Sequence, residues 1–120
     1  MTKSSILSMM QRGVRDMQKE KSGKIIVHVD PDLTDLIPGY LANRERDIAD
    51  IHNALEKNDL ETIRILGHSM KGSGSSYGFE TITDIGMIME KAAKEGRNEE
   101  VSLQMKRLVD YLRRVEIVYD

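Results

Sequence analysis

Apolar residues recur at alternating spacings of three and four in four separate segments after residue 30. This spacing gathers them on one face of an α-helix, and such a face has to be buried against neighbouring elements. The connections between the segments are short, so consecutive helices would lie side by side and run in opposite directions. The pattern predicts an all-α fold, an antiparallel up-and-down four-helix bundle over residues 31–120.

Local signals set the expected ends of the first two helices. The apolar stripe of the first helix runs from Ile37 to Leu55, is interrupted by Arg44, and should end near Asn58. The second helix should begin after Asp59, a good N-cap, and its stripe continues as far as Tyr77. The candidate caps of the first helix are Asp32, Thr34 and Asp35.

The third and fourth segments have equally clear starts. The third is expected over about residues 80–95, and Gly96 is placed to end it in a left-handed conformation. The fourth should start at Asn98, with two glutamates in its first turn that favour the positive end of the helix dipole. Its apolar stripe continues through Val115 to Tyr119, so the helix is expected to reach the last residues of the chain.

Residues 1–30 do not follow the bundle pattern and are predicted to form an N-terminal extension. Residues of about 4–20 allow another amphipathic helix, and residues 25–29, IIVHV, are typical of a short extended segment before a proline. This extension could dock on the bundle, cover one end of it, or form a dimer contact.

The overall composition argues against several classes of partner. The net charge is −2 and the basic residues are spread along the chain, which gives no footprint for nucleic acid or an anionic membrane. Cysteine is absent, so disulfides and thiolate sites are excluded. The apolar cluster ILSMM is too short for a signal peptide or a membrane-spanning helix, and we expect a cytoplasmic protein.

His68 falls on the unexpected side of the second helix. At 100° per residue the buried side is centred near Ile63 and Met70, and His68 lies almost opposite. It is therefore predicted to be exposed, in a patch of basic and small residues. Its expected neighbours along the helix surface are Arg64, Ile65, Lys71, Gly72 and Ser75.

The glycines of this helix are costly and need a reason. Each glycine inside a helix costs roughly 1 kcal/mol relative to alanine. Gly67 and Gly74 lie toward the core, where tight packing of helices explains them. Gly72 lies on the side of His68, where its missing side chain leaves room for a partner.

Other motifs fail on their spacing. The glycines and Lys71 do not fit a phosphate-binding loop or a dinucleotide fingerprint, so we expect no ATP site and no bound cofactor. The turn neighbours of His68 are Arg64 and Lys71, and cations at these positions oppose a metal and favour an anion.

The stretch from His68 to Phe79, HSMKGSGSSYGF, resembles the phospho-acceptor motif of histidine phosphotransfer domains. That motif is H-x-[LM]-K-G-[SA], with a further glycine six residues after the first. The resemblance covers about residues 30–118, including the expected position of the histidine on the second helix.

The resemblance implies a phosphorelay carrier. His68 would accept a phosphoryl group from the phosphoaspartate of a receiver domain or from a sensor histidine kinase, and pass it to the aspartate of another receiver. Lys71 would stabilise the charge, and Gly72 would give the partner clearance. The partner receiver would supply the Mg²⁺, so this chain would be a carrier rather than an enzyme.

The residues agree with such chemistry, since an exposed and neutral imidazole has a free lone pair for covalent phosphoryl transfer. We add Arg64, Ile65 and Ser75 as candidate partner contacts, with Ile65 part of a small apolar docking surface. Two alternatives stay open. The chain could be the phospho-acceptor module of a chemotaxis-type kinase, or a helical interaction module that binds without covalent transfer.

Overall fold

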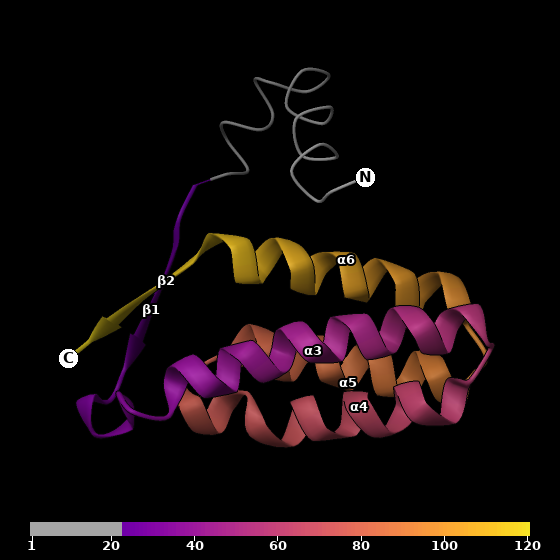
Figure 1. Cartoon of the computed structure of the whole chain (residues 1–120), viewed down its shortest axis with the longest axis horizontal. Helices are drawn as coiled ribbons and strands as arrows, with labels where there is room; N and C mark the ends of the chain where they lie inside the picture. Colours follow the sequence, from indigo (N-terminus) through magenta and orange to yellow (C-terminus); the bar gives the residue numbers. More distant parts are fainter. Residues whose placement is uncertain (1–22) are drawn as a thin grey trace.

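The computed structural model describes residues 23–120, which form four helices and a small two-stranded sheet (Figure 1). The predicted helix over about residues 4–20 lies outside the described residues. The elements in chain order are β1 (Ile25–Val29), the 3₁₀ turn η1 (Pro31–Leu33), α3 (Ile37–Glu56), α4 (Leu60–Ser73), the 3₁₀ turn η2 (Ser75–Tyr77), α5 (Glu80–Lys94), α6 (Asn98–Arg114) and β2 (Val115–Tyr119).

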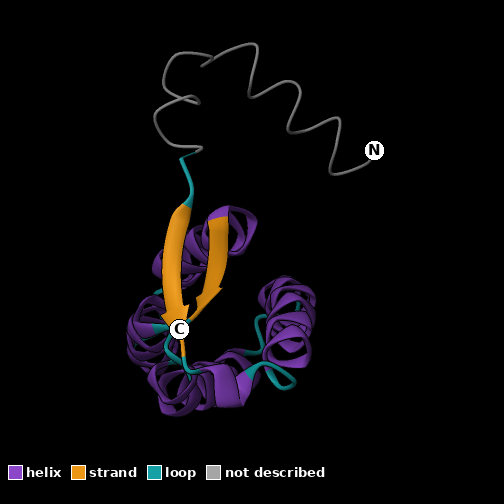
Figure 2. Cartoon of the chain, turned by 90° about the vertical axis from the view of Figure 1, so that its left-hand side faces the viewer, coloured by secondary structure: helices purple, strands orange, loops and turns teal. Residues whose placement is uncertain are grey.

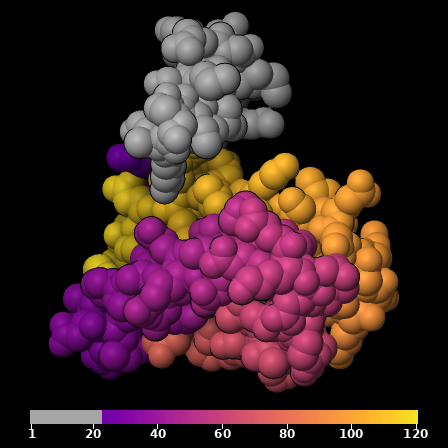
Figure 3. Space-filling model, turned by 45° about the vertical axis from the view of Figure 1, so that its right-hand side comes forward, coloured from indigo at the N-terminus to yellow at the C-terminus, as the bar shows by residue number. Residues whose placement is uncertain are grey.

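The four helices pack in a ring, α3 against α4, α4 against α5, α5 against α6, and α6 back against α3. In Figure 1, α3 runs from left to right and α6 returns from right to left. The space-filling view shows α3 and the start of α4 covering one side of the bundle (Figure 3). The expected all-α four-helix bundle is confirmed.

The core is mostly aliphatic, as the scarcity of aromatic residues in the sequence suggested. Its fully buried side chains come from all four helices, from β1 and from the loop before α5. The largest of them are Phe79, Ile37, Ile51, Ile63, Met70, Ile82, Ile85, Met89, Leu108, Val29 and Val101.

The start of α3 differs from the prediction. Its N-cap is Leu36, without a side-chain hydrogen bond, so none of the three candidate caps serves α3. Asp30 instead caps the short turn η1, where its carboxylate accepts a hydrogen bond from the Asp32 amide at 2.9 Å. The chain thus turns once between β1 and α3.

Arg44 was expected to interrupt the apolar stripe of α3, but it is buried. Its guanidinium donates to the Asp47 carboxylate, with Nε and Oδ2 2.8 Å apart, and lies 4.4 Å from the centre of the Tyr40 ring. Burial raises the pKa of Asp47, and Arg44 opposes this effect. The pair is accommodated because each charge is compensated by the other.

Helix α4 begins as predicted but ends earlier. Asp59 caps it by accepting hydrogen bonds from the amide and the hydroxyl of Thr62. The α-helix ends at Ser73, and Ser75–Tyr77 form the tighter turn η2, which Gly78 closes with a φ of 98°. The prediction that the helix continues to Tyr77 is therefore wrong.

Helix α6 also ends before the predicted point. It starts at Asn98 as expected, after Gly96 with its φ of 72°, but it ends at Arg114. Residues Val115–Tyr119 form β2, which pairs in parallel with β1, so that Val27 lies opposite Ile117. Figure 2 shows the two strands side by side and pointing in the same direction.

The strand pair is tied at several points. Lys24 contacts Glu116 at 3.2 Å, Arg114 donates to the Gly23 carbonyl, and His28 Nδ1 lies 2.9 Å from an Asp120 carboxylate oxygen. The predicted extended segment 25–29 is confirmed as β1, and it docks on the bundle. A domain boundary at residue 30 stays a prediction.

Candidate functional site

Helices α4 and α5 approach each other closely because glycines line their contact. A Cβ atom added to Gly67 would lie 2.7 Å from the Glu90 amide nitrogen, and one added to Gly86 would lie 2.5 Å from the Lys71 amide nitrogen. Any side chain at these positions would push the two backbones apart. The close contact brings residues of α5 next to the exposed face of α4.

The C-terminal end of α4 is held in the same way. A Cβ atom on Gly74 would lie 2.5 Å from the Thr83 amide nitrogen. Thr83 Oγ1 accepts a hydrogen bond from the Ser75 amide at 2.7 Å and donates to the Lys71 carbonyl at 3.3 Å. The turn after α4 is thereby attached to α5.

His68 is exposed, as its helical phase predicted, with 67% of its side chain accessible. Its Nδ1 lies 3.0 Å from Oε2 of Glu90, which reaches across from α5. The other two described histidines also face solvent, and each lies near a carboxylate of its own, His28 near Asp120 and His52 near Glu56. His68 differs from them because its carboxylate partner is buried.

Glu90 is the buried charge at the centre of the site. Only 8% of its side chain is exposed, and Lys71 Nζ lies 2.7 Å from Oε1 while His68 and Lys94 lie on the side of Oε2. The hydrogen bond from Lys71 is the largest cause that lowers the pKa of Glu90 to about 2, followed by that from His68 and the charges of Lys71 and Lys94. Desolvation acts in the opposite direction but is outweighed.

Lys71 and Gly72 lie where the sequence predicted them. Lys71 is half-buried with 38% of its side chain exposed, and its ammonium group is bound to Glu90. An added Cβ on Gly72 would meet nothing within 4 Å, so this glycine faces open space beside the histidine. No packing contact explains the absence of a side chain there.

The three further candidates have different surroundings. Ile65 is 53% exposed on α4, one turn before His68. Arg64 is partly buried and forms a two-point hydrogen-bonded pair with Glu61, with Nε and Oε1 2.9 Å apart. Ser75 does not continue the helical row from His68, because α4 has already ended at Ser73.

Sequence reasoning missed Glu90, Lys94 and Gly86. The expected patch around His68 was basic, whereas the structure places a buried carboxylate within it. One signal was present in the sequence. Gly86 is a glycine inside a helix, on the buried side of α5, and Glu90 follows it by one turn. Only the close approach of two helices could relate these residues to His68.

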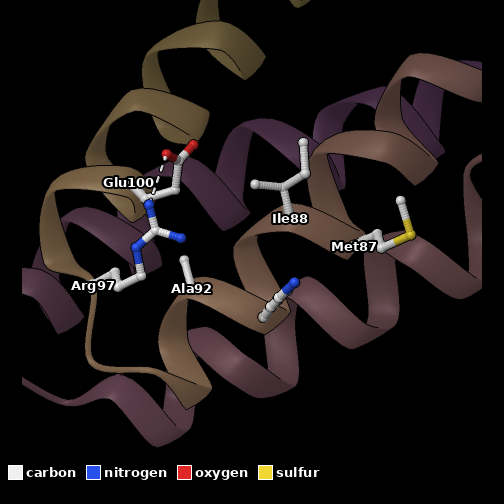
Figure 4. A pocket seen from close by; sticks show the side chains of 6 residues that line it. Met87, Ile88, Ala92, Arg97 and Glu100 are labelled. Atoms are coloured by element: carbon white, nitrogen blue, oxygen red, sulfur yellow. Dashed lines mark ion pairs between the residues drawn. The ribbon is translucent and has the colours of Figure 1, made fainter.

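A shallow groove lies between α5 and the start of α6 (Figure 4). It is lined by Met87, Ile88, Lys91, Ala92, Arg97 and Glu100. Arg97 and Glu100 form an ion pair at 3.8 Å along one wall of the groove. Met87 is 49% exposed and precedes Glu90 by one turn on α5, but none of the candidate residues around His68 lines the groove.

Among residues 23–120, no group of three histidine or acidic side chains is arranged to hold a metal ion. None of the helices in that part of the chain is long and apolar enough to cross a membrane.

The arrangement is an exposed imidazole beside a buried carboxylate, a lysine and an open glycine, on the second helix of a four-helix bundle. A family model of the Hpt domain matches residues 35–116, which is more than half of the chain. The chain therefore belongs to the Hpt domain family, the phosphocarrier modules that take part in histidine phosphotransfer in two-component phosphorelays. No curated protein and no solved structure matched the chain.

Proposed function

We propose that His68 is the phospho-acceptor of this Hpt domain and that its reacting atom is Nε2. The observation that carries the proposal is the 3.0 Å contact between His68 Nδ1 and the buried Glu90 carboxylate, combined with the exposure of the ring. In the proposed role, the chain takes a phosphoryl group from a receiver phosphoaspartate or a histidine kinase and delivers it to another receiver.

The contact with Glu90 selects one form of the imidazole. The pKa of Glu90 is about 2, so this carboxylate is ionised at neutral pH and can only accept hydrogen bonds. Nδ1 must therefore carry the proton and donate it, which leaves the lone pair of a neutral ring on Nε2. Glu90 also orients the ring, so that the nucleophilic nitrogen is held in one direction.

The proposed transfer forms one bond to phosphorus and breaks one. The Nε2 lone pair of His68 attacks the phosphorus of the donor's acyl phosphate, the N–P bond forms, and the P–O bond to the donor aspartate breaks. The aspartate leaves as a carboxylate, and the proton on Nδ1 stays in place. The ring becomes more positive during attack, and Glu90 stabilises this charge.

Lys71 stabilises the charge of the phosphoryl group, and Gly72 leaves room for the partner. The transition state spreads charge over three equatorial oxygens, so a nearby ammonium such as that of Lys71 stabilises it. The open space at Gly72 lets the partner's surface approach Nε2. Ile65 offers an exposed apolar contact and the adjacent Arg64 a polar one, while Ser75 would meet the partner beyond the end of α4.

The partner supplies the remaining half of the reaction. In this proposal the Mg²⁺ ion and the aspartate belong to the receiver domain. A receiver docks on the exposed face of α4 around His68. This face combines polar and apolar side chains with the free space at Gly72.

The proposal is tested by mixing the protein with a phosphorylated receiver domain and Mg²⁺ and measuring intact mass. We expect a gain of one phosphate that is labile in acid and stable in alkali, and that is lost in His68→Gln. His52→Gln is the matched control, since His52 is an exposed helical histidine beside a carboxylate and should leave labelling unchanged. Retained labelling of His68→Gln would exclude His68 as the acceptor.

The same experiment separates the alternative partners. Labelling by a kinase's ATP-binding domain with ATP, and by no receiver, would identify the acceptor module of a kinase. Binding of receivers without any phosphohistidine would identify a non-covalent interaction module.

A further inference from the structure

Lys94 lies beside the acceptor site without an assigned role. It follows Glu90 by one turn on α5, and its Nζ is 3.8 Å from Oε2 of Glu90. The same oxygen accepts the hydrogen bond from His68, whereas Lys71 holds the other oxygen, Oε1. Two lysines from two different helices therefore share one buried carboxylate.

The charges at the site change when the histidine is phosphorylated. Before the reaction, Lys71 and Lys94 together outweigh the single negative charge of Glu90. A phosphoryl group on Nε2 adds about two negative charges across the imidazole ring from that carboxylate. Since only 8% of the Glu90 side chain is exposed, water can compensate its charge poorly, and the carboxylate has to keep a cation.

Lys71 cannot satisfy both anions at its present contact. Its ammonium group is 2.7 Å from Glu90 Oε1, and turning fully to a phosphoryl group on His68 would leave that oxygen without its closest partner. Lys94 has the freedom to replace it, because 57% of its side chain is exposed and Glu90 is the one ion-pair partner it has within the described residues.

We infer that Lys94 is a positioning residue of the phosphorylated state, which takes over the buried Glu90 carboxylate while Lys71 turns to the phosphoryl group on His68. The inference rests on the proposed function of His68 and adds a relay of two lysines to it. Lys94 touches neither the phosphoryl group nor the donor. It acts through Glu90.

The simplest competing explanation is an ordinary surface pair. Glutamate and lysine spaced by four residues stabilise helices slightly, by about 0.2–0.5 kcal/mol, wherever they occur on a surface. Such a pair would affect the unphosphorylated and phosphorylated states equally. The relay predicts an effect that is specific to phosphorylation and that depends on Lys71.

The experiment uses phosphoramidate as the donor, because this small molecule needs no docking surface. The full chain is compared with Lys94→Gln, Lys94→Arg and Lys91→Gln. Lys91 is the matched control, an exposed lysine on the same helix that lines the groove and for which no ion pair is found in residues 23–120. Phosphorylation of His68 is followed by intact mass, and the ring is followed by ¹⁵N NMR.

We expect Lys94→Gln to lower the rate of phosphorylation by about two- to fivefold, which lies within the range for a single partly exposed charge contact. Lys94→Arg should restore the rate, and Lys91→Gln should behave as the wild type. The ¹⁵N shifts of the unphosphorylated His68 ring should report the same Nδ1–H tautomer in all four proteins. When Lys71→Gln is already present, adding Lys94→Gln should lower the rate no further.

Equal rates for Lys94→Gln and Lys91→Gln would overturn the inference while the acceptor role of His68 stands. Loss of the Nδ1–H tautomer in unphosphorylated Lys94→Gln would also overturn it, because Lys94 would then be needed to position the ring before phosphorylation. Failure of every protein, the wild type included, to form phosphohistidine with either phosphoramidate or a phosphorylated receiver would instead reject the proposed function.

Discussion

At the scale of single residues, Glu90 combines burial with a full negative charge. Its neighbours lower its pKa from the ordinary 4.5 to about 2, with the Lys71 hydrogen bond the largest cause. A carboxyl whose pKa is lower in the folded state binds more protons when the chain unfolds. Its contribution to stability is therefore complete above about pH 4.5 and is lost as the pH falls toward 2.

This linkage gives a prediction for Glu90→Gln. The free energy of unfolding of the wild type should fall more steeply between pH 4.5 and pH 2 than that of the variant, since the variant has no proton to take up at this position. Urea unfolding at several pH values measures the difference. Glu45→Gln, at an exposed position on α3, is the control and should keep the wild-type slope. Parallel curves for Glu90→Gln and the wild type would contradict the assignment of this charge.

Gly72 gives a second prediction at this scale. Gly72→Leu should fold normally, because nothing lies within 4 Å of an added Cβ. Its acceptance of phosphate from a receiver should nevertheless fall by about tenfold or more, since displacing a docked partner by even 1 Å is costly for transfer. Acceptance from phosphoramidate should change much less. Gly39→Leu on α3, which also has open space around it, controls for the gain of a side chain in a helix.

The positions of His68 and Gly72 could be predicted from the sequence, whereas the position of Glu90 could not. The exposure of His68 and the open side of Gly72 followed from the period of one helix, so the sequence sufficed. Glu90 lies 22 positions from His68, and its burial depends on how closely α4 and α5 approach. The apolar periodicity of a single helix gives no information on how far α4 and α5 lie from each other.

At the scale of the elements, the contact between α4 and α5 depends on glycines that oppose each other. Gly67 and Gly86 have backbone atoms of the facing helix within 2.5–2.9 Å of where a Cβ would lie. The carboxylate of Glu90 reaches His68 because the helices are this close. The spacing of two helices thus determines the chemistry of the site.

We predict that Gly67→Ala and Gly86→Ala each destabilise the fold by about 2–3 kcal/mol, because a methyl group forces the helices apart. Gly72→Ala should do the opposite and stabilise the protein by about 0.5–1 kcal/mol, since alanine is the better helix former and has room here. Thermal and urea unfolding of the three variants make the comparison. Similar stabilities for all three would contradict the packing described here.

The end of α6 shows why the boundaries of an element were harder to predict than its existence. Residues Val115 and Tyr119 continue the helical spacing of α6, but Val115, Ile117 and Tyr119 also alternate as a strand does. The β-branched residues favour the strand. The deciding factor is β1, a pairing partner some 90 positions earlier in the chain, which local patterns do not reveal.

At the scale of the whole molecule, the pair of β1 and β2 joins the first and last described segments. Ile117 packs against the core from the inner face of the strand pair, whereas the adjacent Val118 is exposed on the outer face. The two strands make no other sheet contact within residues 23–120. A sheet this small depends on its packing against the helices.

Ile117→Asp should therefore release the strand pair and leave the four helices in place. We expect faster amide hydrogen exchange in residues 25–29, a lower melting temperature and a nearly unchanged helical circular dichroism signal, because the buried charge is incompatible with the inner face. Val118→Asp, on the outer face of the same strand, should leave the exchange rates as they are. Unchanged protection of residues 25–29 in Ile117→Asp would show that β1 does not need β2.

The parallel direction of these strands also has a mechanical meaning. Because β1 enters at one end of the pair and β2 leaves at the other, a force applied between residue 23 and residue 120 pulls the strands lengthwise past each other. All the hydrogen bonds of the pair then share the load at once, whereas an antiparallel hairpin pulled at its open ends would yield one bond at a time. The bundle that carries the histidine is thereby shielded from tension in its flanking segments until this small sheet gives way.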